Sequence, residues 1–142
     1  MVIQKFRIFS HDFKEGEEIP KNCGYDHGNK RPTIEVEGGF PNYETLAFIM
    51  DDPDAKAAVG KVWVHFLWYH TASGDRVYGK NSWGKIDYGG PAPPDKRHTY
   101  VFKLYALDCK LDLPNESTKA DVEKAMEGHI IEQVTLTGTY AP

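Results

Sequence analysis

The chain has 142 residues, of which 40% are hydrophobic and 27% are charged, and its formal net charge at pH 7 is −4. This length and composition are typical of one globular domain, residues 1–142, with a core of ordinary size. The acidic balance argues against a general nucleic-acid-binding protein, which needs a basic face, but it is compatible with a small local anion site.

Seven segments have the composition of β-strands. They combine β-branched and aromatic residues with a two-residue alternation or a short apolar run, and turn-forming residues bound them. In chain order they are residues 3–9, 33–37, 45–51, 62–69, 77–78, 99–107 and 130–140.

Polar segments separate these strands. Residues 11–20 are polar and residues 21–32 are rich in Asn and Gly, so both segments predict loops. After the third strand, the Asp-rich turn at residues 51–54 is followed by a short loop containing Gly60. Residues 79–98 predict a long loop with several glycines and prolines. A loop of this length is uncommon in a compact domain and is usually functional.

One helix is predicted, in the C-terminal half of the chain. Ser117 or Thr118 is suited to cap its N-terminus, and Asp121 stands where a capping box requires an acceptor. An apolar stripe that includes Val122 follows, and Gly128 ends the helix. Seven strands and one short helix, without repeated strand–helix alternation, predict a mainly β protein, an antiparallel β-sandwich.

Cysteine usage and hydropathy bear on the cellular compartment. Cys23 and Cys109 do not form a Cys-x-x-Cys pair, so we expect free thiols, with a disulfide between them as the alternative. No apolar run approaches the roughly 18 residues that span a bilayer. The N-terminus also lacks the apolar segment of a signal peptide, so a cytoplasmic protein is expected.

Several polar residues stand where strands begin or end, and together they suggest a site. Asp52 ends the third strand, Trp63 and His65 lie in the fourth, and His98 and Tyr100 begin the sixth. On a two-residue period, His65 shares a face with Trp63 and Leu67. Imidazoles, a tyrosine hydroxyl and backbone N–H groups freed by the glycine turn before His98 would together suit an oxyanion.

Each of these residues also has an ordinary structural interpretation. Asp52 and Asp54 are typical of a turn that caps backbone groups. His65 could be a core histidine bonded to a backbone carbonyl, and His98 and Tyr100 could be ordinary cross-strand neighbours.

Four ordered motifs resemble the phosphatidylethanolamine-binding protein family, especially its short bacterial and archaeal branch. They are Asp52-Pro53-Asp54-Ala55, Trp63-x-His65-Phe66, Tyr88-Gly89-Gly90-Pro91-x-Pro93-Pro94 and His98-x-Tyr100-x-Phe102-x-Leu104-Tyr105. The resemblance extends over nearly the whole chain and implies a Greek-key β-sandwich with a pocket for phosphate-type groups, such as a phosphoethanolamine head group.

Carried over by motif, the implied ligand-binding residues are Asp52, Trp63, His65, Gly90, Pro91, His98 and Tyr100. His65 would bond the anion, and Asp52 would orient His65 or meet a ligand cation. Two departures affect the pocket's charge: Lys56 replaces the family's usual proline, and Thr99 replaces a common basic residue. The chain also has no counterpart of the C-terminal helix that borders the pocket in the animal branch.

The resemblance favours a binding protein that is not an enzyme and needs no cofactor or metal. It also implies possible regulation or inhibition of a protease or kinase, and a possible homodimer. A hydrolase using Asp52 with His65 or His98 is the alternative, although no nucleophilic Ser or Cys stands on a recognisable elbow. A structural module with a vestigial pocket is the third. If the histidines bind the anion as cations, its affinity should fall as pH rises.

Overall fold

The structure is a computed structural model, and it describes residues 6–39, 41–71 and 74–142. The first strand predicted from sequence therefore lies partly outside the described residues. The Thr-Ala-Ser-Gly-Asp sequence of residues 71–75 also predicts a turn, and two of its residues lie outside the described ranges. Within the described ranges no helix is long and apolar enough to cross a membrane. Cys23 and Cys109 both carry free thiols, as expected.

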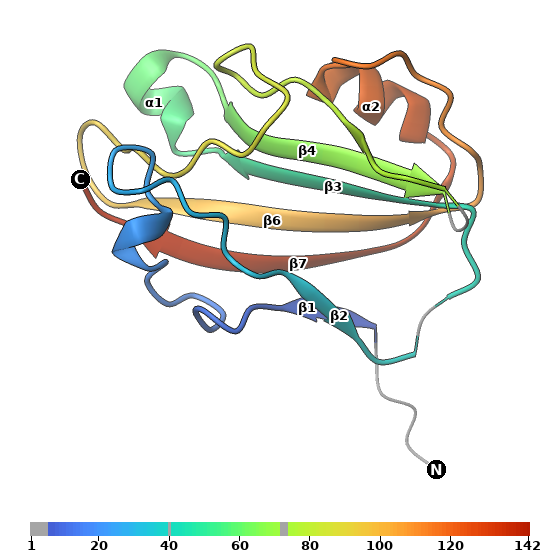
Figure 1. Cartoon of the computed structure of the whole chain (residues 1–142), viewed down its shortest axis with the longest axis horizontal. Helices are drawn as coiled ribbons and strands as arrows, with labels where there is room; N and C mark the ends of the chain where they lie inside the picture. The colour runs from blue at the N-terminus through green and yellow to red at the C-terminus, as the bar shows by residue number, and fades with distance from the viewer. Residues whose placement is uncertain (1–5, 40, 72–73) are drawn as a thin grey trace.

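Five antiparallel strands form the main sheet, in the order β5-β4-β3-β6-β7 (Figure 1). The strands β3, β4 and β5 are consecutive antiparallel neighbours, and β6 then returns beside β3, which is the strand order of a Greek key. The strands are β3 (Thr45–Asp52), β4 (Trp63–Thr71), β5 (Val77–Tyr78), β6 (His98–Leu107) and β7 (Ile130–Tyr140). The expected mainly β, antiparallel fold is confirmed.

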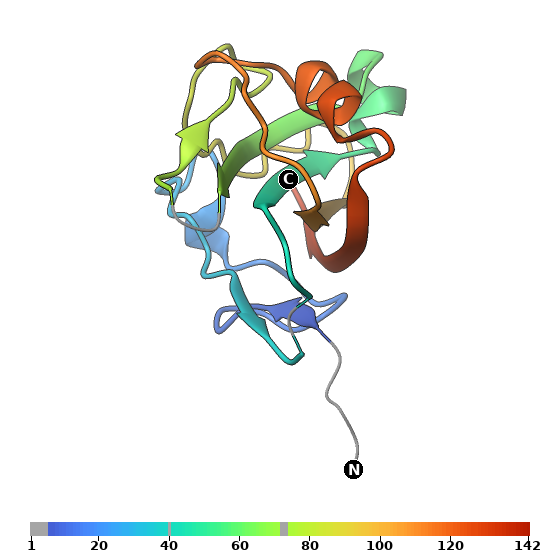
Figure 2. The ribbon, with the colours of Figure 1, turned by 90° about the vertical axis from the view of Figure 1, so that its right-hand side faces the viewer.

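A second, two-stranded sheet is formed by β1 (Arg7–Phe9) and β2 (Glu35–Glu37). Figure 2 and Figure 1 both place it at the opposite end of the molecule from the helices α1 (Ala55–Val59) and α2 (Lys119–Met126). A 3-10 turn at Lys21–Cys23 lies in the loop between β1 and β2.

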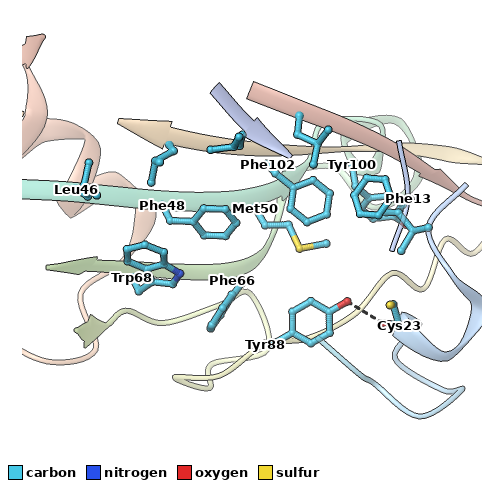
Figure 3. Packing of buried hydrophobic residues seen from close by; sticks show 14 of the residues in the cluster. Phe13, Cys23, Leu46, Phe48, Met50, Phe66, Trp68, Tyr88, Tyr100 and Phe102 are labelled. Atoms are coloured by element: carbon cyan, nitrogen blue, oxygen red, sulfur yellow. Dashed lines mark hydrogen bonds between the residues drawn. The ribbon is translucent and has the colours of Figure 1, made fainter. Parts of the chain in front are cut away.

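The main sheet buries side chains on both faces. On one face, Phe48 and Phe102 pack with Ile8 of β1 and with residues of the N-terminal loop (Figure 3). On the other face, Ile49 and Tyr105 pack against Val122 of α2. Strands covered on both faces explain the nearly continuous apolar runs of β3 and β4.

The helix α2 begins as the sequence predicts. Thr118 is the N-cap: its hydroxyl accepts from Asp121 N at 3.3 Å, and Asp121 Oδ2 accepts from Thr118 N at 3.0 Å. This is a complete capping box. Ser117, the other candidate, instead donates to the carbonyl of Pro114.

The short loop predicted after the Asp-rich turn is wrong, because residues 55–59 form helix α1. Its Ala-Lys-Ala-Ala-Val sequence contains good helix formers, but five residues are too few to show a helical period. Gly60 ends the helix with φ +89°, and its N–H donates to Lys56 O. The left-handed conformation explains the glycine at this position.

Candidate functional site

A cavity of about 230 Å³ opens at the end of the main sheet where β3 stops and β4 and β6 begin. Five residues of the predicted site line it: Asp52, Trp63, His65, His98 and Tyr100. Five more that were not predicted complete the lining: Ala55, Val59, Trp83, Ala92 and Pro94.

A β-bulge brings these side chains to one face of the sheet. Met50 pairs with Phe66 and Asp51 pairs with Val64, so His65 is the extra residue that has no partner on β3. The bulge interrupts the two-residue period, and Leu67 packs in the opposite core. The expectation that His65 and Leu67 share a face is therefore wrong. His65 instead meets Tyr100 edge to face, with ring centroids 5.1 Å apart.

His65 is a buried, neutral imidazole with one nitrogen already bonded. Its Nδ1 lies 2.7 Å from the carbonyl oxygen of Gly89, which only accepts hydrogen bonds, so Nδ1 carries the proton. Burial lowers the pKa of His65 to about 4. At neutral pH the ring is uncharged, and its Nε2 is a hydrogen-bond acceptor.

His98, unlike His65, is held in its charged form by two neighbouring carboxylates. Its Nδ1 donates to Asp52 Oδ2 at 2.6 Å and its Nε2 donates to Asp95 Oδ1 at 2.7 Å. Burial by itself lowers the pKa of His98, but the hydrogen bonds to the two carboxylates outweigh it and raise the pKa. His98 is therefore an imidazolium with both nitrogens occupied.

Asp52 orients His98, so the expectation that it orients His65 is wrong, and its contact with a ligand cation stays a prediction. Its Oδ2 accepts from His98, and its Oδ1 accepts from the backbone N–H of Ala55 at 3.2 Å. Both oxygens are thus engaged. Burial raises the pKa of Asp52, and the hydrogen bond from His98 opposes that shift.

Three buried polar atoms on the lining residues have no hydrogen-bond partner in the described part of the chain. They are Trp63 Nε1, His65 Nε2 and Tyr100 Oη. Burial, followed by the charge of Asp52, raises the pKa of Tyr100, so its hydroxyl keeps its proton. An unpaired buried polar atom costs about 1–3 kcal/mol, and in native proteins such atoms call for an explanation.

Gly90 and Pro91 do not line this cavity. The N–H of Gly90 donates to Asn29 Oδ1 at 2.7 Å, and Pro91 O accepts from Tyr25 N at 3.0 Å. A Cβ added at Gly90 would lie 2.0 Å from Cys23 O, so only glycine fits there. These two residues hold the loop of residues 20–30 against the site.

The glycine turn does not supply free N–H groups, contrary to expectation. The N–H of Gly90 is taken by Asn29, and the N–H of Gly89 donates to His65 O at 2.9 Å. The turn instead positions His65 through both the carbonyl and the N–H of Gly89. Its contribution to an anion site is therefore indirect.

Sequence reasoning missed Trp83 and Asp95. Trp83 stacks on Tyr25 with ring centroids 4.5 Å apart, and it meets Trp63 and His65 edge-on. A tryptophan in a long glycine-containing loop is itself a signal for a pocket wall. Asp95, directly after two prolines and three residues before His98, could have been found by its spacing.

The lining offers little for hydrolysis. No Ser, Thr, Cys or Lys belongs to the ten lining residues, and both nitrogens of His98 are engaged. Within the described ranges, the one group of three possible metal ligands lies elsewhere, at Asp108, Cys109 and His129, where His129 Nδ1 is 2.7 Å from Asp108 Oδ1.

Known proteins resemble this chain over nearly its whole length. The model of the phosphatidylethanolamine-binding protein family matches residues 9–141. A UPF0098 protein of Methanothermobacter thermautotrophicus is 35% identical over 147 residues, covering 92% of this chain and 95% of that protein.

Two solved structures share the fold. A putative phosphatidylethanolamine-binding protein homolog, CT736 of Chlamydia trachomatis, superposes with a TM-score of 0.85 at 31% identity, covering 96% of this chain and 97% of that one. YbcL of E. coli, described as a new member of the mammalian PEBP family, gives a TM-score of 0.84 at 25% identity, with coverage of 95% and 97%.

Proposed function

Because this chain belongs to the phosphatidylethanolamine-binding protein family, we propose that it is a binding protein whose cavity takes a small phosphate-type anion. Family membership supports binding as the general activity. The assignment of a phosphate-type ligand depends on the cavity. Its main support is the set of three unpaired polar atoms on Trp63, His65 and Tyr100.

The chemistry of these atoms specifies the ligand. Trp63 Nε1 only donates, neutral His65 Nε2 only accepts, and the hydroxyl of Tyr100 does either. A ligand that satisfies all three needs oxygen acceptors and at least one O–H donor. A phosphate monoester that keeps one proton meets this requirement, because it has both P–O acceptors and a P–O–H donor.

The charges around the cavity favour a ligand of low charge. His98 contributes one positive charge, and Asp52 and Asp95 contribute two negative charges directly bonded to it. This cluster has a net negative charge, so it repels a dianion more strongly than a monoanion. Trp63 and Trp83 give the cavity an apolar wall, which excludes water from the polar atoms.

The test is calorimetric titration with inorganic phosphate, phosphoethanolamine and a nucleoside monophosphate. Tyr100→Phe removes its hydroxyl with little change of shape, Trp63→Phe removes the indole N–H together with one ring, and His65→Ala removes the acceptor. His27→Gln, in an exposed loop, is the matched control. We expect each pocket variant to weaken binding at least tenfold and the control to leave it unchanged. Equal affinities across the wild type and all pocket variants would contradict the proposal.

We also propose that the protein regulates a protease or a kinase. Only the family membership supports this part of the proposal, so it needs its own experiment. Inhibition assays on protease and kinase panels, with the protein alone and with saturating phosphate, would show whether the ligand-bound state has such an activity. A change in inhibition between the two states would link the cavity to a protein partner.

A further inference from the structure

A second cavity, of about 330 Å³, lies on the same face of the sheet and shares no lining residue with the first. Its floor is aromatic, formed by Phe48 of β3, Phe66 and Trp68 of β4 and Phe102 of β6. Figure 3 shows Phe48, Phe66 and Trp68 near one another, with Tyr88 beyond Phe66. We call this cavity the aromatic groove; Met50, Arg76, Tyr88 and residues 31–35 complete its lining.

Two exposed arginines cover the rings of the aromatic groove. The guanidinium carbon of Arg76 lies 3.9 Å from the centroid of the Trp68 ring, and that of Arg31 lies 5.3 Å from the centroid of Phe66. A guanidinium placed over an aromatic face is held by a cation–π interaction, and its in-plane N–H donors stay available to an anion.

These two guanidinium groups are not neutralised by the protein. Among the described residues no carboxylate lies within ion-pair distance of Arg31 or Arg76. The one acidic lining residue, Glu35, has its Oε2 3.0 Å from His11 Nε2. The chain has 21 acidic and 17 basic residues and is negative as a whole, whereas these two arginines give the groove an unpaired positive charge.

We propose that the aromatic groove binds a small organic monocarboxylate, with its apolar body on the aromatic floor and its carboxylate held by Arg31 and Arg76. Planar guanidinium donors match the planar geometry of a carboxylate and can bond both of its oxygens. The volume is at the lower end of the roughly 300–1,000 Å³ that is usual for ligand pockets, so the body is small, such as one phenyl ring with a short chain. This site is independent of the first cavity, lined by Trp63, His65 and Tyr100, which we call the phosphate cavity after its proposed ligand.

The three tryptophans of the chain distinguish the two cavities in one experiment. Trp68 lies in the aromatic groove, whereas Trp63 and Trp83 line the phosphate cavity. We would titrate 15N-labelled protein with 3-phenylpropionate and follow the three indole N–H cross-peaks. The expected result is a saturable shift of the Trp68 peak, with the Trp63 and Trp83 peaks unchanged.

Matched probes and variants isolate the role of charge. The neutral alcohol 3-phenylpropanol should bind at least tenfold more weakly than the acid. Arg31→Ala combined with Arg76→Ala should remove this preference, whereas Arg7→Ala, at an arginine paired with Glu37, should keep it. Because the substituted arginines are exposed, the variants should fold, and a thermal melt checks this.

Three results would overturn the inference: no shift of the Trp68 peak at millimolar acid, equal binding of the acid and the alcohol, or a shift confined to Trp63 and Trp83. The last result would place the acid in the phosphate cavity. A failure of phosphate binding with an intact Trp68 response would leave this inference standing and contradict only the proposed function.

Discussion

Asp51 and Asp52 are neighbours on β3, but their carboxylates serve opposite faces of the sheet. Asp51 Oδ2 lies 3.0 Å from Lys103 Nζ and 2.7 Å from Lys119 Nζ, at the side packed against α2. Asp52 Oδ2 lies 2.6 Å from His98 Nδ1, at the side of the cavity that Trp63 and Tyr100 line. Substitutions at these adjacent residues should therefore have separable consequences.

Asp51→Asn should reduce stability without changing phosphate affinity. Asp51 is buried, and its carboxylate ties β3 to β6 and to the first turn of α2 through two lysines. Breaking a buried ion pair by removing one partner costs up to about 3–5 kcal/mol, and partial exposure of both lysines reduces that to about 1–3 kcal/mol. Urea unfolding and phosphate titration on the same variant measure both effects. A loss of affinity without a loss of stability would contradict this assignment.

Asp52→Asn should lower the pKa of His98. The substitution keeps the shape of the side chain but removes one of the two carboxylates that raise this pKa. NMR titration of the imidazole 15N signals should show His98 losing its second proton at a lower pH in the variant than in the wild type. Asp54→Asn is the matched control, since Asp54 accepts from Thr99 N and does not contact His98. An unchanged His98 titration in Asp52→Asn would show that Asp95 alone sets its charge.

His65 should make the protein less stable in acid. Its pKa falls from 6.5 to about 4 on folding, so between these pH values the unfolded chain binds a proton at His65 that the native state does not bind. The stabilising contribution is complete above pH 6.5, declines as pH falls toward 4, and amounts to about 3 kcal/mol by linkage. Denaturant unfolding at several pH values should show this decline, and His65→Gln should lack it. Equal pH profiles for the two proteins would mean that His65 titrates normally.

The strands and the capping box could be predicted because their signals are local. Alternation over residues 99–107 and 130–140, and the Thr118–Asp121 spacing, depend on neighbours within a few positions. The geometry of the site could not be predicted from local signals. The bulge at His65 depends on which residue of β3 pairs with which residue of β4, and packing between the strands decides that register.

Sequence periodicity also could not predict the hydrogen-bond partners of the two histidines. His98 meets Asp52, which is 46 positions away, and the carbonyl that orients His65 is 24 positions away. Sequence resemblance identified five residues that line the cavity but assigned Asp52 to the wrong imidazole. A motif conveys which residues gather, whereas the hydrogen-bond geometry fixes which of them interact.

The pH dependence of ligand affinity provides the sharpest check of the phosphate cavity. From sequence we expected the affinity to fall with rising pH if the histidines bind the anion as cations, but His65 is neutral above pH 4 and both nitrogens of His98 are engaged. The required proton therefore comes from the ligand. A phosphate monoester has its second pKa near about 6, so its affinity should fall about tenfold for each pH unit above roughly 7.

A sulfate monoester is the matched probe, because it has the same shape and a single charge but no proton to donate. It should bind more weakly than the phosphate monoester at pH 6, since His65 Nε2 stays unpaired, and its affinity should be flat between pH 6 and 8. Calorimetry with both esters over this range measures the two slopes. Parallel profiles for the two esters would show that His65 Nε2 does not receive a ligand proton, and the assignment of a protonated phosphate would be wrong.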